Sequence, residues 1–376
     1  MMEFIFQLSF WTLAYVYAGY PLLVWLLSRV FGREPSRRDI TPSVSLLLPV
    51  YDEEAHIEAK LTNSLALDYP KDKLEIVVAS DGSTDRTNAL AKTFEAQGVR
   101  LLAVRDNIGK SAILSRTVPL VRGEIVVFSD ATIELEPDAV RKLVRHFADA
   151  RVGAVSAAYR LRPSADLRAS GEGLYWRYEA FLKRQESRLH SVIGAHGPCY
   201  AIRKALFARL GATQINDDYL IPMRVIAQGY RVVYDPDVVV WERELVSVEG
   251  EFARRRRIAA GNCQQIVALR RMLSPFYGWV ALCFFSHKVL RTLAPLFLVA
   301  LFVSSLWLPQ PLSAAALTLQ AALYGSAVAG YGCQRRGWKV RWLSAPLYFC
   351  LGNLAMLAGV LRYCFGKHRV VWERAR

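Results

Sequence analysis

The chain has 376 residues, of which 53% are hydrophobic, and a formal net charge of +15. This length suggests two or three folding units, and the hydrophobic share is higher than is usual for a water-soluble domain. The six cysteines form no C-x-x-C pair and no histidine-flanked cluster, which argues against a zinc site or a disulfide framework. The basic residues form no nucleic-acid-binding motif, so the charge is better explained by cytoplasmic loops and by attraction to anionic lipid.

The N-terminal segment has the character of a membrane anchor. Residues 4–28 contain no charged side chain, and this length suffices to cross a hydrocarbon core of about 30 Å. The apolar part is longer than that of a secretory signal and is followed by Arg29 and Arg33 rather than by small residues. We therefore predict a retained transmembrane anchor over residues 1–32, with the following domain in the cytoplasm.

Between residues 41 and 248, apolar runs alternate with helical patterns. Four runs end near residues 50, 79, 104 and 128, and each is followed by a polar turn and a helical segment. This order predicts an α/β fold with a mostly parallel sheet and right-handed crossovers. Ligands of such sheets bind beyond the carboxyl ends of the strands, which is where Asp81 and Asp130 fall.

The remainder of the chain is basic and then apolar. A basic helix over residues 249–272 contains the run Arg254–Arg257, and apolar blocks follow at 276–308, 313–333 and 343–365. We predict interfacial helices over 249–290, with the first block divided near Val289. Transmembrane segments over 291–366 and a basic tail over 367–376 complete the expected domain order, in which 41–248 is the cytoplasmic domain.

Polar residues follow four consecutive strands at the predicted ligand edge. Turn chemistry alone would favour some of them, since Asp and Asn are common in tight turns. A nucleotide suits the whole set better, because a carboxylate can accept an N–H of the base and a lysine can approach a phosphate. Asp130 can bind Mg²⁺ or Mn²⁺ together with the diphosphate. The set comprises Asp52, Glu53, Asp81, Asp85, Asn107, Lys110, Asp130 and Thr132.

Four stretches carry a family resemblance. VSLLLPVYDEEAHI (44–57), EIVVASDGSTDRT (75–87), NIGKSAIL (107–114) and EIVVFSDATIELEPDAV (124–140) resemble the successive motifs of family 2 glycosyltransferases with a GT-A fold. The match spans about residues 43–270. The flanking apolar blocks resemble the membrane-embedded branch of that family, which includes synthases of the hyaluronan, cellulose and poly-N-acetylglucosamine type.

The resemblance implies a donor site for a nucleotide-sugar, with a UDP-sugar expected first. Asp130 matches the first acid of the family's D-x-D motif, but the second acid is replaced by Thr132. The metal ligands implied are therefore Asp130 and Thr132, with the donor diphosphate supplying further oxygens for Mg²⁺ or Mn²⁺. The donor-binding residues implied are Pro49, Tyr51, Glu53, Asp81, Lys110 and Asp130.

Two further motifs are implied to hold the acceptor and the base. Residues 216–218, Asn-Asp-Asp, resemble the T-E-D motif, and Asp218 would be the general base, although two acids at a helix start also follow from capping and dipole rules. The stretch GAHGPCYAIRK (194–204) resembles the Gly-rich acceptor segment. The acceptor-binding residues implied are His196, Gly197, Cys199 and Asp217.

The stretch EFARRRRIAAG resembles the position of the Q-x-x-R-W motif of polymerising members. Arg257 matches the motif's arginine, Arg254 replaces its glutamine and Ile258 replaces its tryptophan. Arg257 would stabilise the leaving diphosphate. In the tail, Trp372 and Arg374 loosely resemble a gating segment. Three C-terminal spans would place this basic tail outside, so either one apolar block does not cross or the tail is not a gate.

We therefore expect an inverting, metal-dependent hexosyl- or N-acetylhexosaminyltransferase, multi-pass in the inner (plasma) membrane. It would transfer sugar to a growing glycan or lipid-linked acceptor in cell-surface or exopolysaccharide synthesis, by polymerisation or single addition. Its partners would be the donor, the acceptor and membrane lipids, with no nucleic acid, and any export subunits are not specified. The alternatives are a polyprenyl-phosphate sugar synthase and a catalytically silent membrane scaffold or sensor. The presence of Lys110, Asp130 and Asp218 argues against the silent scaffold.

Overall fold

The computed structural model describes residues 1–161, 168–242, 248–338 and 340–366. These residues form two compact units. The sheet unit contains residues 30–161 and 183–242, and the helical unit contains residues 1–29, 168–182, 248–338 and 340–366. Helix α7 (Arg168–Leu189) contributes residues to both, since the division falls after Leu182. The tail residues Trp372 and Arg374 lie outside the described residues.

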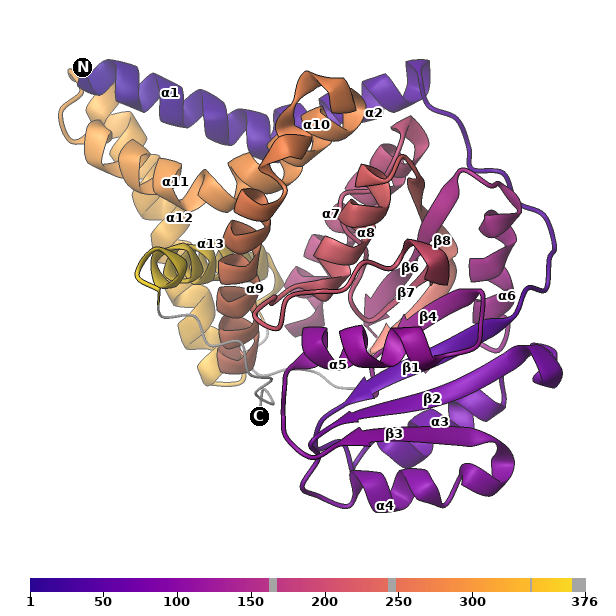
Figure 1. Ribbon diagram of the computed structural model, residues 1–376. Helices are drawn as coiled ribbons and strands as arrows, with labels where there is room; N and C mark the ends of the chain where they lie inside the picture. Colours follow the sequence, from indigo (N-terminus) through magenta and orange to yellow (C-terminus); the bar gives the residue numbers. More distant parts are fainter. Residues whose placement is uncertain (162–167, 243–247, 339, 367–376) are drawn as a thin grey trace. The chain divides into compact units, whose positions relative to one another are not determined.

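The sheet unit is built on an eight-stranded sheet with the order β3-β2-β1-β4-β7-β6-β8-β5 (Figure 1). The strands β3, β2, β1 and β4 are mutually parallel, as are β6 and β8. Strand β7 runs antiparallel to β4 and β6, and β5 runs antiparallel to β8. The strands are β1 Val44–Val50, β2 Leu74–Asp81, β3 Val99–Val104, β4 Ile125–Ser129, β5 Ile133–Leu135, β6 Val152–Leu161, β7 Cys199–Arg203 and β8 Arg231–Glu242.

The parallel half of the sheet follows the pattern expected from the sequence. Every residue of β1 and β4 is buried, as a continuous apolar run predicts for a strand covered on both faces. Right-handed crossovers place α3 and α4 on one face and α5 on the other, because the strand order reverses between β1 and β4 (Figure 1). That reversal is a topological switch point, where α/β sheets leave a crevice beyond their strand ends. The helices of this unit are α3 Ile57–Leu65, α4 Thr87–Lys92, α5 Lys110–Thr117, α6 Ala139–Val144 and α8 Asp217–Ala227.

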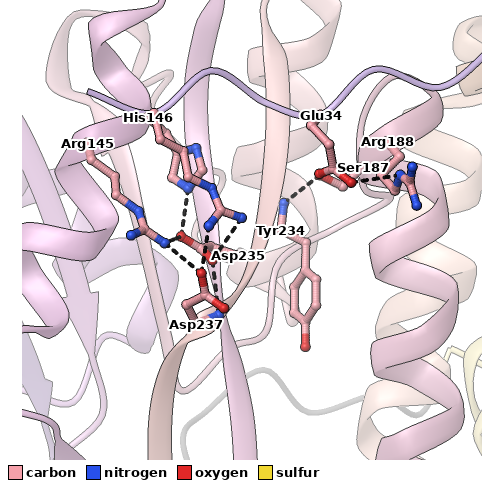
Figure 2. A network of polar contacts seen from close by, with 9 residues as sticks. Glu34, Arg145, His146, Ser187, Arg188, Tyr234, Asp235 and Asp237 are labelled. Carbon is pink, nitrogen blue, oxygen red and sulfur yellow. Dashed lines mark hydrogen bonds and ion pairs between the residues drawn. The ribbon is translucent and has the colours of Figure 1, made fainter. Parts of the chain in front are cut away.

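A buried polar network joins distant parts of the sheet unit (Figure 2). Asp235 on β8 is fully buried, and its Oδ2 lies 2.7 Å from both His146 Nε2 and Arg145 Nη2. Arg37, from the segment that precedes β1, forms an ion pair of 2.6 Å with Asp237 and lies 3.7 Å from Asp235. The network therefore fastens the segment before β1 to the carboxyl half of the sheet.

The helical unit contains four helices that are long and apolar enough to cross a membrane: Met2–Val30, Trp279–Ser305, Leu312–Arg335 and Arg341–Cys364. Its other long helix is α9 (Val248–Ala268), which carries the arginine run. Helices α1 (Met2–Ala14) and α2 (Tyr20–Val30) flank a π-helical segment in the first apolar helix, and the last two apolar helices are α12 and α13. The apolar character predicted for both ends of the chain is confirmed.

The predicted division of the first C-terminal block near Val289 is wrong. Helix α10 (Trp279–Cys283), a π-helical segment (Phe284–Leu290) and α11 (Arg291–Ser305) form one continuous helix. The charged residues that suggested a break have partners instead. Arg291 forms an ion pair with Glu179 of α7, whose second carboxylate oxygen lies 3.4 Å from His287 Nε2. Charged groups in apolar helices persist where such pairing compensates for the loss of water.

Candidate active site

The first part of the site lies where β2 and β4 end. Asp81, the last residue of β2, is fully buried, and its carboxylate accepts the backbone N–H groups of Ile108 (2.9 Å) and Gly109 (2.8 Å). Gly109 has a φ of 91°, a conformation that favours glycine, and it turns the chain into α5. Lys110 therefore begins α5 in a fixed position, and its Nζ donates to Asp130 Oδ1 at 2.7 Å.

The second part of the site is the first turn of α8. Asp217 and Asp218 both lie in this turn, where the helix dipole favours negative charge. Lys110 Nζ is 4.0 Å from Asp217 Oδ1, and the hydroxyl of Tyr200 on β7 donates to Asp217 Oδ2 at 3.3 Å. The structure thus brings Lys110, Asp130 and the Asp217–Asp218 pair together from three distant parts of the sequence.

The segment 194–198 packs directly against Asp218. A Cβ atom added at Gly197 would lie 2.7 Å from Asp218 Oδ2, so this position requires a residue without a side chain. Ala195 N donates to the Asp218 carbonyl at 2.9 Å, and the buried Lys183 donates to the Gly194 carbonyl at 2.8 Å. The carboxylate of Asp218 is therefore bordered by bare backbone.

The electrostatics of the cluster raise the pKa of Asp218. Burial, together with the neighbouring Asp217 carboxylate, raises the pKa of Asp218 to about 6, although Lys110 opposes the shift. Burial alone would lower the pKa of Lys110, but Asp130 and Asp217 outweigh it and raise the pKa above its ordinary value. Lys110 is therefore a permanent cation, while Asp218 can exchange a proton near neutral pH.

A buried lysine supports the turn that carries Asp130. Lys60 of α3 is only 1% exposed, and its Nζ donates to Ser129 Oγ and to the Ile133 carbonyl, each at 2.7 Å. These contacts hold both ends of the turn that contains Asp130 and Thr132. The side chain of Asp130 remains 34% exposed, and this partial exposure suits a cation site with a single protein carboxylate.

The predicted donor-binding residues at β1 lie beside the loop that follows β2. Tyr51 and Glu53 follow β1, in which Pro49 is buried. Glu53 N donates to Thr87 Oγ1 at 2.7 Å, and its Oε2 lies 2.7 Å from His56 Nδ1. These contacts fix the end of β1 against the start of α4. The donor-binding roles of Pro49, Tyr51, Glu53, Asp81, Lys110 and Asp130 stay predictions.

The predicted acceptor residues have different surroundings. Gly197 and Asp217 lie in the cluster, whereas the ring of His196 is buried, with Nδ1 3.0 Å from the Ala157 carbonyl and an edge-on contact with Tyr234. Cys199 is fully buried in β7, and burial raises the pKa of its thiol to about 12. Backbone of this segment is therefore better placed to border a ligand than either of these two side chains.

Arg257 belongs to α9 of the helical unit and is exposed. Its catalytic role stays a prediction. Sequence reasoning missed three residues of the sheet unit that shape the cluster, namely Lys60, Lys183 and Tyr200. The two lysines gave no signal because lysine is almost always exposed. Tyr200 lies within the predicted acceptor segment (194–204). Successive residues of a strand point to opposite faces, so the sign available in the sequence was that Tyr200 faces away from Cys199.

The comparisons with known proteins agree with this geometry. Residues 45–211 match the protein family described as Glycosyl transferase family 2. A β-monoglucosyldiacylglycerol synthase of Synechocystis is 27% identical over 276 residues, covering 71% of this chain and 58% of that protein. A poly-β-1,6-N-acetyl-D-glucosamine synthase of Staphylococcus aureus is 26% identical over 230 residues, covering 60% of this chain and 55% of that protein. The chain thus spans less than two thirds of the length of these relatives.

Among solved structures, a mannosyltransferase of Pyrobaculum calidifontis in complex with GDP-Man and Mn²⁺ has a TM-score of 0.72 and 25% identity. The likeness covers 98% of this chain and all of that one. It extends over the sheet and the apolar helices, and it identifies the fold of the sheet unit as GT-A. This likeness and the match over residues 45–211 agree that the sheet unit is similar to family 2 glycosyltransferases.

Proposed function

We propose that the protein transfers a sugar, with inversion, from a nucleotide-sugar to a lipid-linked or glycan acceptor at the membrane. The observation that carries the proposal is the half-buried Asp218 carboxylate, whose pKa is raised to about 6 beside Lys110, Asp130 and the bare backbone of Gly197. A base needs this combination of a pKa near the working pH and an open approach for the acceptor.

The reaction follows from the arrangement of charges. Asp218 accepts the proton of the acceptor hydroxyl as its oxygen attacks the anomeric carbon from the face opposite the diphosphate. The bond between the anomeric carbon and the diphosphate oxygen breaks, and its electron pair leaves with the nucleoside diphosphate. Lys110, held by Asp130, stabilises the negative charge that develops on the leaving group. A single displacement of this kind inverts the anomeric configuration and needs no covalent nucleophile.

A divalent cation fits the carboxyl end of β4, within limits set by the residues present. No group of three or more His, Cys, Asp or Glu side chains suited to a metal occurs in the part of the chain that the structure describes. Mg²⁺ and Mn²⁺ often take one or two protein carboxylates and complete their shell with substrate phosphates and water. Asp130 would hold the ion, with Thr132 nearby, and the bound ion would neutralise diphosphate charge. The mannosyltransferase complex, which holds Mn²⁺, supports this proposal.

The proposed setting is the inner membrane, with the sheet unit in the cytoplasm. The four long apolar helices and the arginines after the first of them support it. A lipid acceptor is favoured by these helices and by the similarity to a β-monoglucosyldiacylglycerol synthase. The similarity to a poly-N-acetylglucosamine synthase keeps a glycan acceptor in the proposal.

The test is a donor screen with the purified full chain in detergent. UDP-, GDP- and dTDP-sugars are supplied singly with Mg²⁺ or Mn²⁺, and release of the nucleoside diphosphate is measured with and without membrane lipid extract. We expect one donor class to be cleaved, faster with extract, and expect chelation of the cation to stop cleavage. Failure of every donor, or cleavage that persists in an Asp218→Asn variant, would remove the proposed function.

A further inference from the structure

The last apolar helix, α13, has the length of a membrane span but begins beside a cationic segment. The stretch 292–334, which contains most of α11 and α12, has no charged side chain. It suits a hairpin that crosses a bilayer and returns, and Ser313 Oγ of α12 donates to the Ser305 carbonyl of α11 at 2.8 Å. Arg335 ends α12, and Arg341 begins α13. The positive-inside tendency therefore places the start of α13 on the cytoplasmic side.

The second half of α13 packs against the basic helix α9 of the same unit. A Cβ atom added at Gly359 would lie 2.4 Å from the Arg256 carbonyl and 2.5 Å from Ala259 Cβ, so the two backbones are in close contact. At Gly352, a Cβ atom would lie 2.9 Å from a guanidinium nitrogen of Arg255. Small residues allow helices to approach in this way. The second half of α13 therefore lies at the same depth as the arginine run of α9.

Helix α9 is too polar to lie in the hydrocarbon of a bilayer. Arg254 and Arg255 are paired with Glu251 at 2.8 and 2.5 Å, while Arg257 is exposed. The sequence has no aspartate or glutamate between residues 252 and 372. Arginine is costly near the bilayer centre, whereas at the interface it is attracted to lipid phosphates. A crossing α13 would take its second half, and α9 with it, into the hydrocarbon, so both ends of α13 belong on the side of the arginines.

The two faces of α13 differ in the way that a helix lying in the membrane plane requires. Successive helical residues are about 100° apart, so Gly352, Ala355 and Gly359 share the face that meets α9. Leu354 and Leu361 lie on the opposite face and are 58% and 45% exposed. Small residues thus meet the basic helix, and large apolar side chains point away from it. An interfacial helix buries such an apolar face among the acyl chains.

We infer that α9 and α13 form a surface that binds the inner leaflet, with the large apolar side chains of α13 among the acyl chains and the arginines of α9 at the lipid phosphates. The apolar block 343–365 is then the one that does not cross. The described part of the chain crosses three times, through the first apolar helix, the helix that ends in α11, and α12. The inference uses the proposed membrane setting but not the proposed reaction, so the donor screen and the tests of α13 succeed or fail separately.

The first test labels single cysteines of the full chain with a maleimide that does not cross membranes. Cys364, the last residue of α13, is exposed and is the position tested. Gln310→Cys, between α11 and α12, and Trp338→Cys, before α13, are each combined with Cys364→Ser as reference positions for the two sides. Both reference residues are exposed. The remaining cysteines that are not buried are replaced by serine in every protein, namely Cys263, Cys333 and Cys350.

We expect Cys364 and Trp338→Cys to be labelled in inside-out vesicles and at least tenfold less in intact cells, and Gln310→Cys to show the reverse. A crossing α13 would give Cys364 the pattern of Gln310→Cys, and that result would overturn the inference. If the cysteine-depleted protein fails to fold, a fluorescent protein fused after the last residue of the unmodified chain replaces the labels. It fluoresces when it folds in the cytoplasm but not after export, so a dark fusion of normal abundance would also overturn the inference.

The second test measures depth with nitroxide labels in vesicles that contain phosphatidylglycerol. Leu354→Cys and Leu361→Cys carry labels on one face of α13, two turns or about 10 Å apart along the helix. Collision with oxygen and with a water-soluble nickel complex should place both labels at the same depth to within about 5 Å, one helical turn. Labels at Leu319 and Val328 of α12, both 72% exposed, are the matched control and should differ by about 13 Å. A difference of about 10 Å along α13 would show a crossing helix.

Discussion

Two aspartates of the sheet unit, the half-buried Asp218 and the fully buried Asp235, have pKa values shifted in opposite directions. Asp218 lies near two other carboxylates, and burial with Asp217 raises its pKa to about 6. Burial would also raise the pKa of Asp235, but the hydrogen bond from His146 and the ion pair with Arg145 hold it below its ordinary value (Figure 2). The neighbouring charges and hydrogen bonds therefore leave an exchangeable proton on Asp218 and a fixed charge on the more deeply buried Asp235.

The difference shows how to separate a reactive acid from a structural one. Asp235 is contacted by Arg145 and His146, which directly follow α6, and by Arg37 from the segment before β1, so its charge serves to join elements. Asp218 is bordered by the backbone of Gly197 and by other acids, and Lys110 offsets their effect on its pKa only in part. Strongly shifted acids of the second kind are the better candidates for chemistry.

The largest expected effect tests the proposal that Asp218 is the general base. Asp218→Asn keeps the size of the side chain but removes the proton acceptor, so we expect the transfer rate to fall by on the order of 10³-fold. The measurement is the initial rate of sugar transfer at pH 7.5 under saturating donor. Donor affinity should change little, and a rate within threefold of the unmodified protein would refute the base assignment.

The structural side is tested by Asp235→Asn. Removing the buried carboxylate leaves Arg145 with the exposed Asp237 as its remaining acidic partner among the described residues, so we expect the free energy of unfolding to fall by roughly 3–5 kcal/mol. Thermal unfolding in detergent, followed by tryptophan fluorescence, measures the loss. Asp237→Asn is the matched control, because its side chain is 51% exposed and pairs with the same arginines. It should cost less than about 1 kcal/mol, and equal losses would show that burial of Asp235 is unimportant.

The pH dependence of stability and of sugar transfer tests the raised pKa of Asp218. Because the pKa of Asp218 is raised in the folded protein, its ionisation lowers the free energy of unfolding. This loss is absent below about pH 4, the pKa of an unfolded aspartate, and complete above about pH 6. Asp218→Asn should therefore be more stable than the unmodified protein at pH 7.5, by on the order of 1–2 kcal/mol, and equally stable near pH 4. For the unmodified protein, transfer should fall tenfold per pH unit below about pH 6. A flat rate between pH 5 and 7 would contradict the assigned pKa.

The sequence predicts that Lys110 and Asp130 meet because each follows a strand of the parallel half, whose carboxyl ends share one edge. Asp218 is expected beside them from the resemblance of residues 216–218 to the T-E-D motif, since β7, the strand before it, runs antiparallel. The sequence does not predict Lys60, Lys183 or Asp235, because their burial depends on contacts between segments roughly 70 to 90 residues apart or on backbone carbonyls. The division expected near Val289 failed for the same reason, since Glu179 is distant in sequence from Arg291.

The smallest expected effect concerns Arg37, the most exposed cation of the Asp235 network. Its side chain is 36% exposed, and Arg145 and His146 remain on Asp235 when it is removed. Arg37→Gln should therefore lower the free energy of unfolding by less than about 1 kcal/mol, and the loss should shrink in high salt because exposed pairs are screened. Thermal unfolding at low and high ionic strength measures both properties. A salt-independent loss as large as that of Asp235→Asn would mean that the segment before β1, rather than the buried pair of Asp235 with Arg145, holds this part of the sheet unit together.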